Sequence, residues 1–200
     1  MDKKIETFCP SDKKDWRDWL EQNYKKKEAV WLIFFKKKSS TPNLSWSEAV
    51  DAALCFGCID SVKKTIDSER YIQYFSRRKP NSIWSKINKD KIEKLTESGL
   101  MTEPGLKSIE IAKQNGSWTL LDSVENLEIP EDLEQEFKQY PESKDYFLSL
   151  SKSVRKTMLA WVALAKRQDT RAKRVTEIAK NARHKKKPKQ FRLEKNGLQK

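Results

Sequence analysis

The sequence contains few glycines and almost no histidine, with five Gly and one His among 200 residues. Neither G-x-x-x-x-G-K-S/T nor G-x-G-x-x-G occurs, so the chain lacks the glycine-rich loop that cradles nucleotide phosphates. The one histidine, His184, lies in the basic run of residues 183–187. The remaining sequence therefore lacks the usual general base, and this excludes hydrolase triads built on histidine.

Long hydrophobic runs are also missing. The longest are AVWLIFF at residues 29–35 and MLAWVALA at residues 158–165, whereas a membrane helix needs about 20 apolar residues. The first residues, MDKKIETFCPSDKK, contain no apolar signal core. We therefore expect a soluble, cytoplasmic protein without a membrane span. Seven Trp, eight Phe and five Tyr supply the bulky apolar mass that disordered chains lack, so the chain should fold.

Cysteine is scarce, but two of the three cysteines, Cys55 and Cys58, form a C-x-x-C pattern. A redox dithiol needs a depressed thiol pKa, which the N-terminus of a helix usually provides. Here the pattern closes a predicted helix, so the helix dipole opposes a thiolate and two incidental buried thiols are favoured. A zinc site would need Cys9 and His184 to join the pair from far along the chain. We predict no metal and no cofactor, and we assign no catalytic residue.

Positive charge is concentrated at the C-terminal end. Residues 152–200 carry 17 basic and 3 acidic residues, whereas the preceding residues carry 25 basic and 26 acidic ones. This asymmetry indicates an electrostatic partner, with nucleic acid and anionic lipid as the generic candidates, and a solubilising tail is the alternative. Nucleic-acid binding here would be weak, independent of sequence and sensitive to salt. The candidate polyanion contacts are Lys173, Lys180, Arg183, Lys185, Lys186, Lys187 and Lys189.

Hydrophobic spacing predicts an α+β domain over residues 1–116. The apolar run at 29–35 is too short for a typical helix and predicts a buried strand. Two β-prone runs, 59–66 and 71–76, flank a polar turn and predict a hairpin. Together with the predicted helices, these elements indicate a small antiparallel-containing sheet with packed helices.

The best-defined helix lies between the first strand and the hairpin. Ser45-x-x-Glu48 is a capping box, and apolar residues follow at helical spacing until Gly57. A glycine directly after the last periodic residue predicts a left-handed position that ends the helix.

The C-terminal part is predicted to contain three regions. Residues 117–141, with seven acidic residues and one Lys, indicate an acidic connector lying across the surface. Residues 142–183 form a C-terminal helical segment that contains a helical pair, at about 153–167 and 171–183. Residues 184–200 offer no periodic apolar face and place like charges side by side, which predicts a disordered basic tail.

Polar and aromatic residues near the predicted sheet form a candidate ligand pocket. Glu48 and Asp51 share one helix flank, and Asp60 follows the helix-ending turn, so paired carboxylates facing Arg70 or Arg77 are geometrically allowed. The alternative is that Glu48 only completes its cap and the charged residues form a structural ion-pair network. The candidates are Trp46, Glu48, Asp51, Asp60, Arg70, Tyr71, Arg77, Ser82 and Trp84.

Five short motifs are distinctive. They are W-x-E-A-V-D-x-A-L-C-F-G at 46–57, I-D at 59–60, E-R-Y at 69–71, S-I-W-S at 82–85 and A-K-R-x-x-T-R-x-x-R at 165–174. Through these motifs the chain resembles the YdeI/OmpD-associated family, also called bacteriocin-protection proteins. The similarity runs from about Trp16 to Ala182, and members often carry Trp where this chain has Cys58.

The resemblance implies a bacterial cytoplasmic protein, with an α+β unit similar in outline to frataxin-like and YjbR-type folds and a helical C-terminal part. It implies no reaction, because the family is named for stress and bacteriocin phenotypes. The first hypothesis is therefore a non-enzymatic binding protein in envelope or antimicrobial stress tolerance, whose partner is an unknown protein or small molecule. The second is a ligand-binding protein or enzyme that uses the candidate pocket, and the third is a nucleic-acid-associated protein acting through its basic end.

Overall fold

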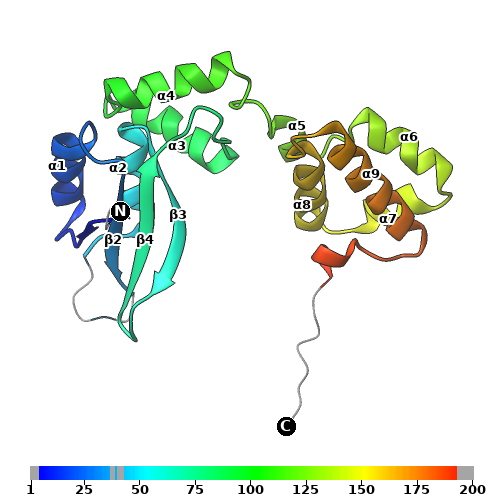
Figure 1. Ribbon diagram of the computed structural model, residues 1–200, viewed down its shortest axis with the longest axis horizontal. Coiled ribbons are helices and arrows are strands. Elements are labelled where there is room, and N and C mark those ends of the chain that lie inside the picture. The colour runs from blue at the N-terminus through cyan, green and yellow to red at the C-terminus, as the bar shows by residue number, and fades with distance from the viewer. Residues whose placement is uncertain (1–4, 37–38, 40–42, 193–200) are drawn as a thin grey trace, which may run out of the picture. The chain divides into compact units, whose positions relative to one another are not determined.

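The computed structural model describes residues 5–36, 39 and 43–192 (Figure 1). The chain forms two compact units that divide between Thr119 and Leu120. The first unit contains a sheet and helices, and the second contains helices only in its described part. The predicted class, α+β followed by a C-terminal helical region, is therefore confirmed.

The first unit is built on a small mixed sheet. Its strands run in the order β1-β2-β4-β3, with β1 parallel to β2 and the other neighbours antiparallel. The predicted buried strand and hairpin are present, and β1 is a short addition that sequence spacing does not reveal. The strands are β1 (Thr7–Phe8), β2 (Ala29–Phe35), β3 (Cys58–Thr65) and β4 (Arg70–Arg77).

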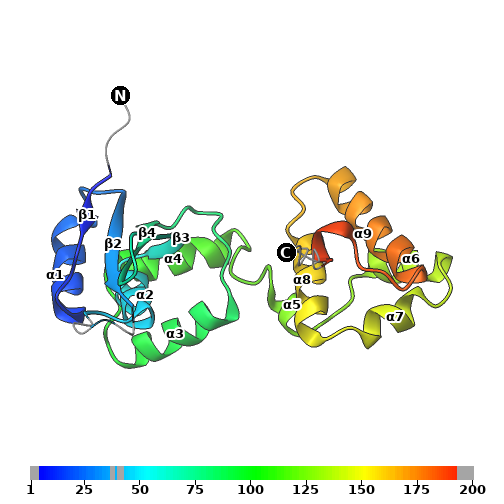
Figure 2. The ribbon, with the colours of Figure 1, turned by 90° about the horizontal axis from the view of Figure 1, so that it is seen from below.

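Helices cover one side of this sheet. Helix α2 packs against β3 and lies with α3 on the same side of the sheet (Figure 2). Burial alternates along β2, where Val30, Leu32 and Phe34 are buried. The described helices of this unit are α1 (Lys13–Asn23), α2 (Trp46–Cys55), α3 (Lys86–Glu97) and α4 (Glu103–Gln114).

At the end of α2, its backbone passes close to the backbone of α4. Gly57 has φ +69°, which confirms the predicted left-handed position, and a Cβ there would lie 2.8 Å from the carbonyl oxygen of Pro104. A Cβ on Gly105 would lie 2.2 Å from the carbonyl oxygen of Cys55. Because neither position has room for a side chain, these two glycines let α4 dock directly on the end of α2.

The second unit packs its helices around a core of its own. Leu133 and Phe137, which the sequence assigned to a surface connector, are buried in this core. The acidic side chains of the same stretch pair with basic ones, since Asp132 binds Arg171 at 2.6 Å. The elements are α5 (Asp122–Glu125), α6 (Glu131–Gln139), α7 (Ser143–Ser149), α8 (Lys152–Ala163), α9 (Gln168–Arg183) and the 3-10 helix η1 (Lys189–Phe191).

The first part of the predicted basic tail folds against this unit. Pro188 is buried, and the ring of Phe191 meets that of Trp161 edge-on with centroids 5.4 Å apart. The Arg192 guanidinium donates a hydrogen bond of 2.8 Å to the side chain of Asn181. Residues 184–192 therefore differ from the predicted disordered tail, because sequence periodicity could not reveal the contacts of single apolar side chains. The remainder of that prediction, residues 193–200, lies outside the described residues.

Among the helices that the structure describes, none has the length and apolar character needed to cross a membrane.

Candidate functional site

The side chains predicted to form one pocket lie in separate places. Trp46 and Asp60 meet, because the indole Nε1 donates a 2.9 Å hydrogen bond to Asp60 Oδ2. Gln73 Nε2 donates to the same oxygen at 2.9 Å. Tyr71 lies beside them, and its ring lies under the ammonium of Lys63 at 4.0 Å. These five residues line an open groove, which we call the Trp46 groove.

The other two carboxylates of the prediction have structural partners. Glu48 completes the capping box, and its hydrogen bonds with Ser45 lower the pKa of the Glu48 carboxyl. Asp51 forms an ion pair of 2.5 Å with Lys91 of α3. The pairing of these carboxylates with Arg70 or Arg77, which the spacing allows, is therefore not formed, and for Glu48 the cap interpretation agrees with the geometry.

The predicted arginines also serve the local fold. Arg70 pairs with Asp67 across the hairpin turn at 2.7 Å. Arg77 donates to the carbonyl oxygens of Lys25 and Lys27, at 3.0 and 3.3 Å, and so ties the turn after α1 to the end of β4. Ser82 accepts a 3.1 Å hydrogen bond from the amide of Lys79, which shapes the loop that follows β4.

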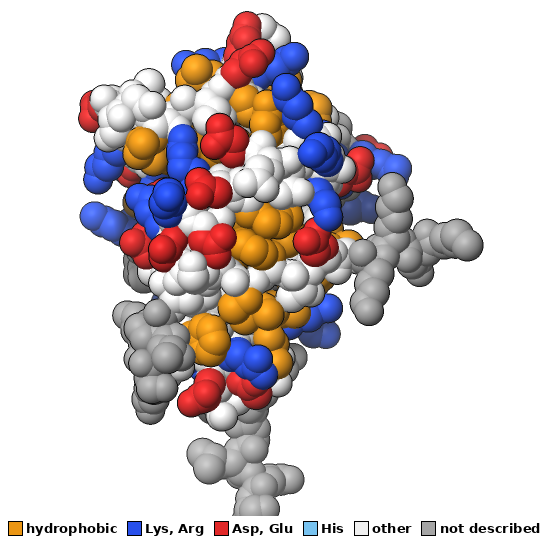
Figure 3. Space-filling view, turned by 90° about the vertical axis from the view of Figure 1, so that its left-hand side faces the viewer, with side chains coloured by type: hydrophobic (Ala, Val, Ile, Leu, Met, Phe, Trp, Pro, Cys, Tyr) orange, Lys and Arg blue, Asp and Glu red, His pale blue; other side chains and the backbone are white. Residues whose placement is uncertain are grey.

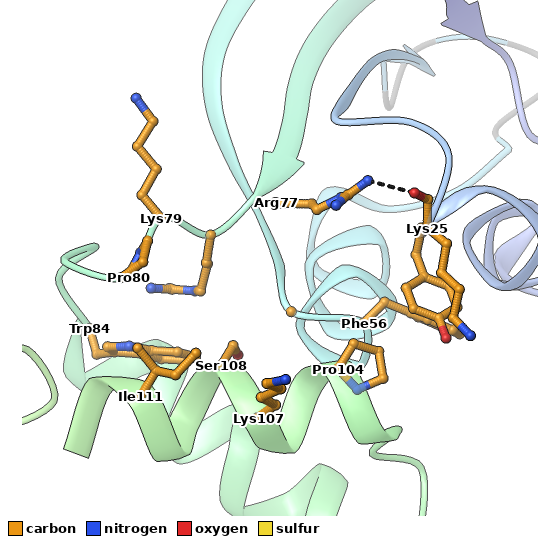
Figure 4. A pocket seen from close by; sticks show the side chains of 13 residues that line it. Lys25, Phe56, Arg77, Lys79, Pro80, Trp84, Pro104, Lys107, Ser108 and Ile111 are labelled. Carbon is orange, nitrogen blue, oxygen red and sulfur yellow. Dashed lines mark hydrogen bonds between the residues drawn. The ribbon is translucent and has the colours of Figure 1, made fainter. Parts of the chain in front are cut away.

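Trp84 and Arg77 line a cavity of about 430 Å³ in the first unit (Figure 4). Figure 4 shows α4 on one side of this cavity and the end of β4 on the other. We call it the basic-aromatic pocket. Its lining residues are Tyr24, Lys25, Phe56, Gly57, Arg77, Arg78, Lys79, Pro80, Trp84, Pro104, Lys107, Ser108 and Ile111.

Arg78 is one of the lining residues that the sequence prediction missed. Its guanidinium carbon lies 3.5 Å from the centroid of the Trp84 ring, and its Nη1 donates to the carbonyl oxygen of Ile83 at 3.1 Å. Its Nε and Nη2 are buried without a hydrogen-bond partner among the described residues. Burial lowers the pKa of Arg78 to about 10, with the charge of Asp60 acting in the opposite direction. Arg78 is thus a half-buried cation whose hydrogen-bonding capacity is only partly used.

The pocket also concentrates positive charge. Besides Arg77 and Arg78, its described lining includes Lys25, Lys79 and Lys107 and no acidic residue. The distribution differs on the face seen from the α1 side, where basic and acidic side chains are interspersed around hydrophobic ones (Figure 3). The run R-R-K-P at residues 77–80, directly after a strand, is the sequence signal that could have pointed to this pocket. Lys25 and Lys107 join it only through the tertiary fold.

The candidate polyanion contacts lie on the second unit. Lys173, Lys180 and Arg183 are exposed on α9, and the remaining four lysines lie in the segment that folds back after it. Within that segment Lys187 is half-buried and the other three are exposed. On the same helix, a stripe of Val175, Ile178, Ala179 and Ala182 is buried in the core.

The cysteines are free thiols in the first unit. Cys55 and Cys58 are buried and Cys9 is exposed. Burial raises the pKa of Cys58 to about 11 and also raises that of Cys55, although the nearby Arg17 acts in the opposite direction on Cys55. Such thiols carry almost no thiolate at neutral pH. In the part of the chain that the structure describes, no group of three or more His, Cys, Asp or Glu side chains could hold a metal ion.

Two family models match the chain, one in each unit. Residues 8–108 match a domain of unknown function (DUF8412), and residues 126–185 match the family described as Bacteriocin-protection, YdeI or OmpD-Associated. The resemblance found in the sequence is therefore confirmed for the C-terminal unit. The motifs from Trp46 to Ser85 lie in the part that the other model matches. No curated protein and no solved structure matches the chain, so the likeness to frataxin-like and YjbR-type folds stays a prediction.

Proposed function

The chain belongs to the family of the domain of unknown function DUF8412, and a bacteriocin-protection unit follows that domain. Since the first family carries no known function, we propose one from the geometry of the first unit. The protein is a non-enzymatic binding protein that holds a small organic anion in the basic-aromatic pocket. The observation that carries this proposal is the partly satisfied, buried guanidinium of Arg78 inside a cavity whose described lining holds four further cations.

Electrostatics supports an anionic ligand. A buried charge is costly unless it is paired, and Arg78 makes no salt bridge among the described residues. A bound anion would supply the missing partner. Because Nε and Nη2 are covered by protein, a ligand oxygen would reach them after a small rotation of the side chain, and before that rotation the guanidinium acts through its charge.

The composition of the lining supports binding over catalysis. The described lining offers cations, aromatic rings and prolines, and it includes neither a carboxylate nor an imidazole to move a proton. The hydroxyl of Ser108 donates to the backbone oxygen of Gly105 at 2.7 Å. The volume of about 430 Å³ falls in the range of small-molecule sites.

A matched pair of arginine variants tests this proposal. Isothermal titration calorimetry with benzoate and phenyl phosphate should detect binding of at least one probe to the wild-type protein. Arg78→Met should abolish that binding, whereas Arg70→Met should leave it unchanged, because Arg70 lies at the start of β4, outside the pocket. Absence of binding to the wild-type protein, or equal binding by both variants, would contradict the proposal.

We place this binding protein in the cytoplasm, in tolerance of envelope or antimicrobial stress. The description of the C-terminal family supports the role in antimicrobial tolerance, whereas the cytoplasmic location is an expectation from the sequence. In a bacterial strain whose survival of bacteriocin depends on this protein, Arg78→Met should reduce survival and Arg70→Met should not. Equal survival with both variants would separate the pocket from the phenotype.

A second candidate function, binding of nucleic acid, is favoured by the fold of residues 184–192. Lys185 and Lys186 are held by hydrogen bonds to the end of α9, from their amides to the carbonyl oxygens of Ala182 and Asn181 at 2.9 and 3.0 Å. These lysines would therefore present charge from a fixed segment, which lowers the ordering cost of contacts with phosphates.

Salt dependence tests the second candidate. A variant with Lys185, Lys186 and Lys187 changed to Gln should lose DNA affinity and show a shallower salt slope. The same three residues changed to Arg should keep both, because the charge is preserved. If the Gln variant retains the affinity and the slope, this segment is not the contact.

A further inference from the structure

We propose that the ligand of the basic-aromatic pocket is a compact phosphate monoester with an apolar, flat organic group. This inference rests on the proposed function, since it specifies the anion that the pocket holds. It depends on the number of cations, on the directions from which they come and on the apolar character of the remaining lining.

The number of cations favours a ligand with more than one negative charge. The described lining contributes five basic side chains, of which Arg77 is engaged with two carbonyl oxygens. A carboxylate carries one charge, whereas a phosphate monoester carries about 1.5 to 2 negative charges at pH 7. The phosphoryl group therefore neutralises more of the repulsion among the cations of the lining.

The directions of the cations also favour a phosphoryl group. Lys107 belongs to α4, Arg78 follows β4, and Lys25 belongs to the turn after α1. The side chain of Lys79 points away from these residues and does not join them (Figure 4). Figure 4 shows Lys107 and Arg77 on opposite sides of the pocket. One guanidinium fork can satisfy a planar carboxylate, whereas the three oxygens of a phosphoryl group accept donors from several directions.

The remaining lining residues indicate which kind of organic group the ligand carries. Phe56 and Tyr24 lie with ring centroids 5.8 Å apart, and Pro104 and Ile111 contribute apolar surface from α4. Ser108 is the one neutral hydroxyl besides Tyr24 in the described lining, and it already donates to the backbone. The pocket thus offers few partners for sugar hydroxyls or base edges, and this argues for an aryl or similarly flat apolar ester over a nucleotide.

Calorimetric titration of the full-length protein with four probes tests the inference. Phenyl phosphate should bind at least about tenfold more tightly than benzoate, which has the same ring and one charge. It should also bind more tightly than inorganic phosphate, which lacks the ring, and more tightly than adenosine 5′-monophosphate, which has a polar body. Lys107→Met should lower the affinity for phenyl phosphate by about tenfold. Lys113→Met should leave that affinity unchanged, because Lys113 is on the same helix outside the pocket.

The outcomes separate this inference from the proposed function. If benzoate binds as tightly as phenyl phosphate, the phosphoryl assignment is wrong while the anion pocket stands. If inorganic phosphate or the nucleotide binds as tightly as phenyl phosphate, the assignment of a flat apolar group to the ligand is wrong. If Lys107→Met and Lys113→Met bind phenyl phosphate with the same affinity, the phosphoryl group is not held at α4. If no probe binds, the proposed function fails together with the inference.

Discussion

The guanidinium carbon of Arg78 lies 3.5 Å from the centre of the Trp84 ring, so a half-buried arginine, with Nε and Nη2 buried, rests on a buried aromatic ring. The same tryptophan also contacts the Trp118 ring, at a centroid distance of 5.0 Å and an interplanar angle of 51°. Cation–π attraction compensates part of the desolvation of the guanidinium. It does not satisfy Nε and Nη2, which have no hydrogen-bond partner among the described residues. This residual cost leads to the first prediction.

Arg78→Met should leave the melting temperature equal to or above that of the wild-type protein. Methionine keeps an apolar contact with Trp84 and removes the desolvated charge. Arg77→Met should instead lower the free energy of unfolding by about 1 kcal/mol, because two hydrogen bonds to backbone oxygens are lost. Denaturant titration of the two variants measures both effects. A marked loss of stability in Arg78→Met would show that this arginine is structural.

Gly57→Ala should destabilise the first unit more than Gly99→Ala. Both glycines have positive φ, +69° and +66°, and this alone costs an alanine about 1 kcal/mol. A Cβ at Gly57 also collides with the Pro104 carbonyl oxygen at 2.8 Å, whereas a Cβ at Gly99 meets nothing within 4 Å. We expect at least about 2 kcal/mol for Gly57→Ala by denaturant unfolding. Equal losses in both variants would mean that the crossing of α2 and α4 can relax.

Iodoacetamide should alkylate Cys9 and spare Cys55 and Cys58 in the native protein at pH 8. With its pKa raised to about 11, Cys58 has only about one thiolate in a thousand at that pH, and burial also limits access. The pKa of Cys9 is raised as well, so its reaction should be slower than that of a free thiol. Mass spectrometry should find one modified site, and three after denaturation. Equal rates at Cys58 and Cys9 would restore the redox interpretation of the C-x-x-C pattern.

Phe191→Ala should lower the free energy of unfolding of the C-terminal unit by about 1 kcal/mol. The mutation removes an edge-on aromatic contact with Trp161, and such pairs contribute about 0.5 to 1.5 kcal/mol. The neighbouring exposed Lys189 provides the control, because Lys189→Ala removes no such contact. Thermal unfolding followed by near-ultraviolet circular dichroism compares the two. If both variants have the melting temperature of the wild-type protein, residues 184–192 do not stabilise the unit.

Local features of the fold could be predicted because their signals lie within a few residues of one another. The capping box of Ser45 and Glu48 spans one turn, and Gly57 ends its helix directly after the last apolar position. The buried strand β2 is visible as one apolar run. By contrast, the sequence predicts a surface connector where the structure has α6, because the amphipathic spacing of Leu133 and Phe137 does not reveal which core buries them.

The sequence by itself determined the class, the capped helix and its end, and the family resemblance of the C-terminal unit. Only the tertiary structure decided which charged residues meet. Asp51 is paired with Lys91, forty positions away, so it is not available to the predicted pocket. Lys25 and Lys107 reach one cavity because α4 docks on the end of α2, where Gly105 allows two backbones to touch. Charge pairing depends on distances between chain segments, and hydrophobic periodicity reports only which face of each segment is buried.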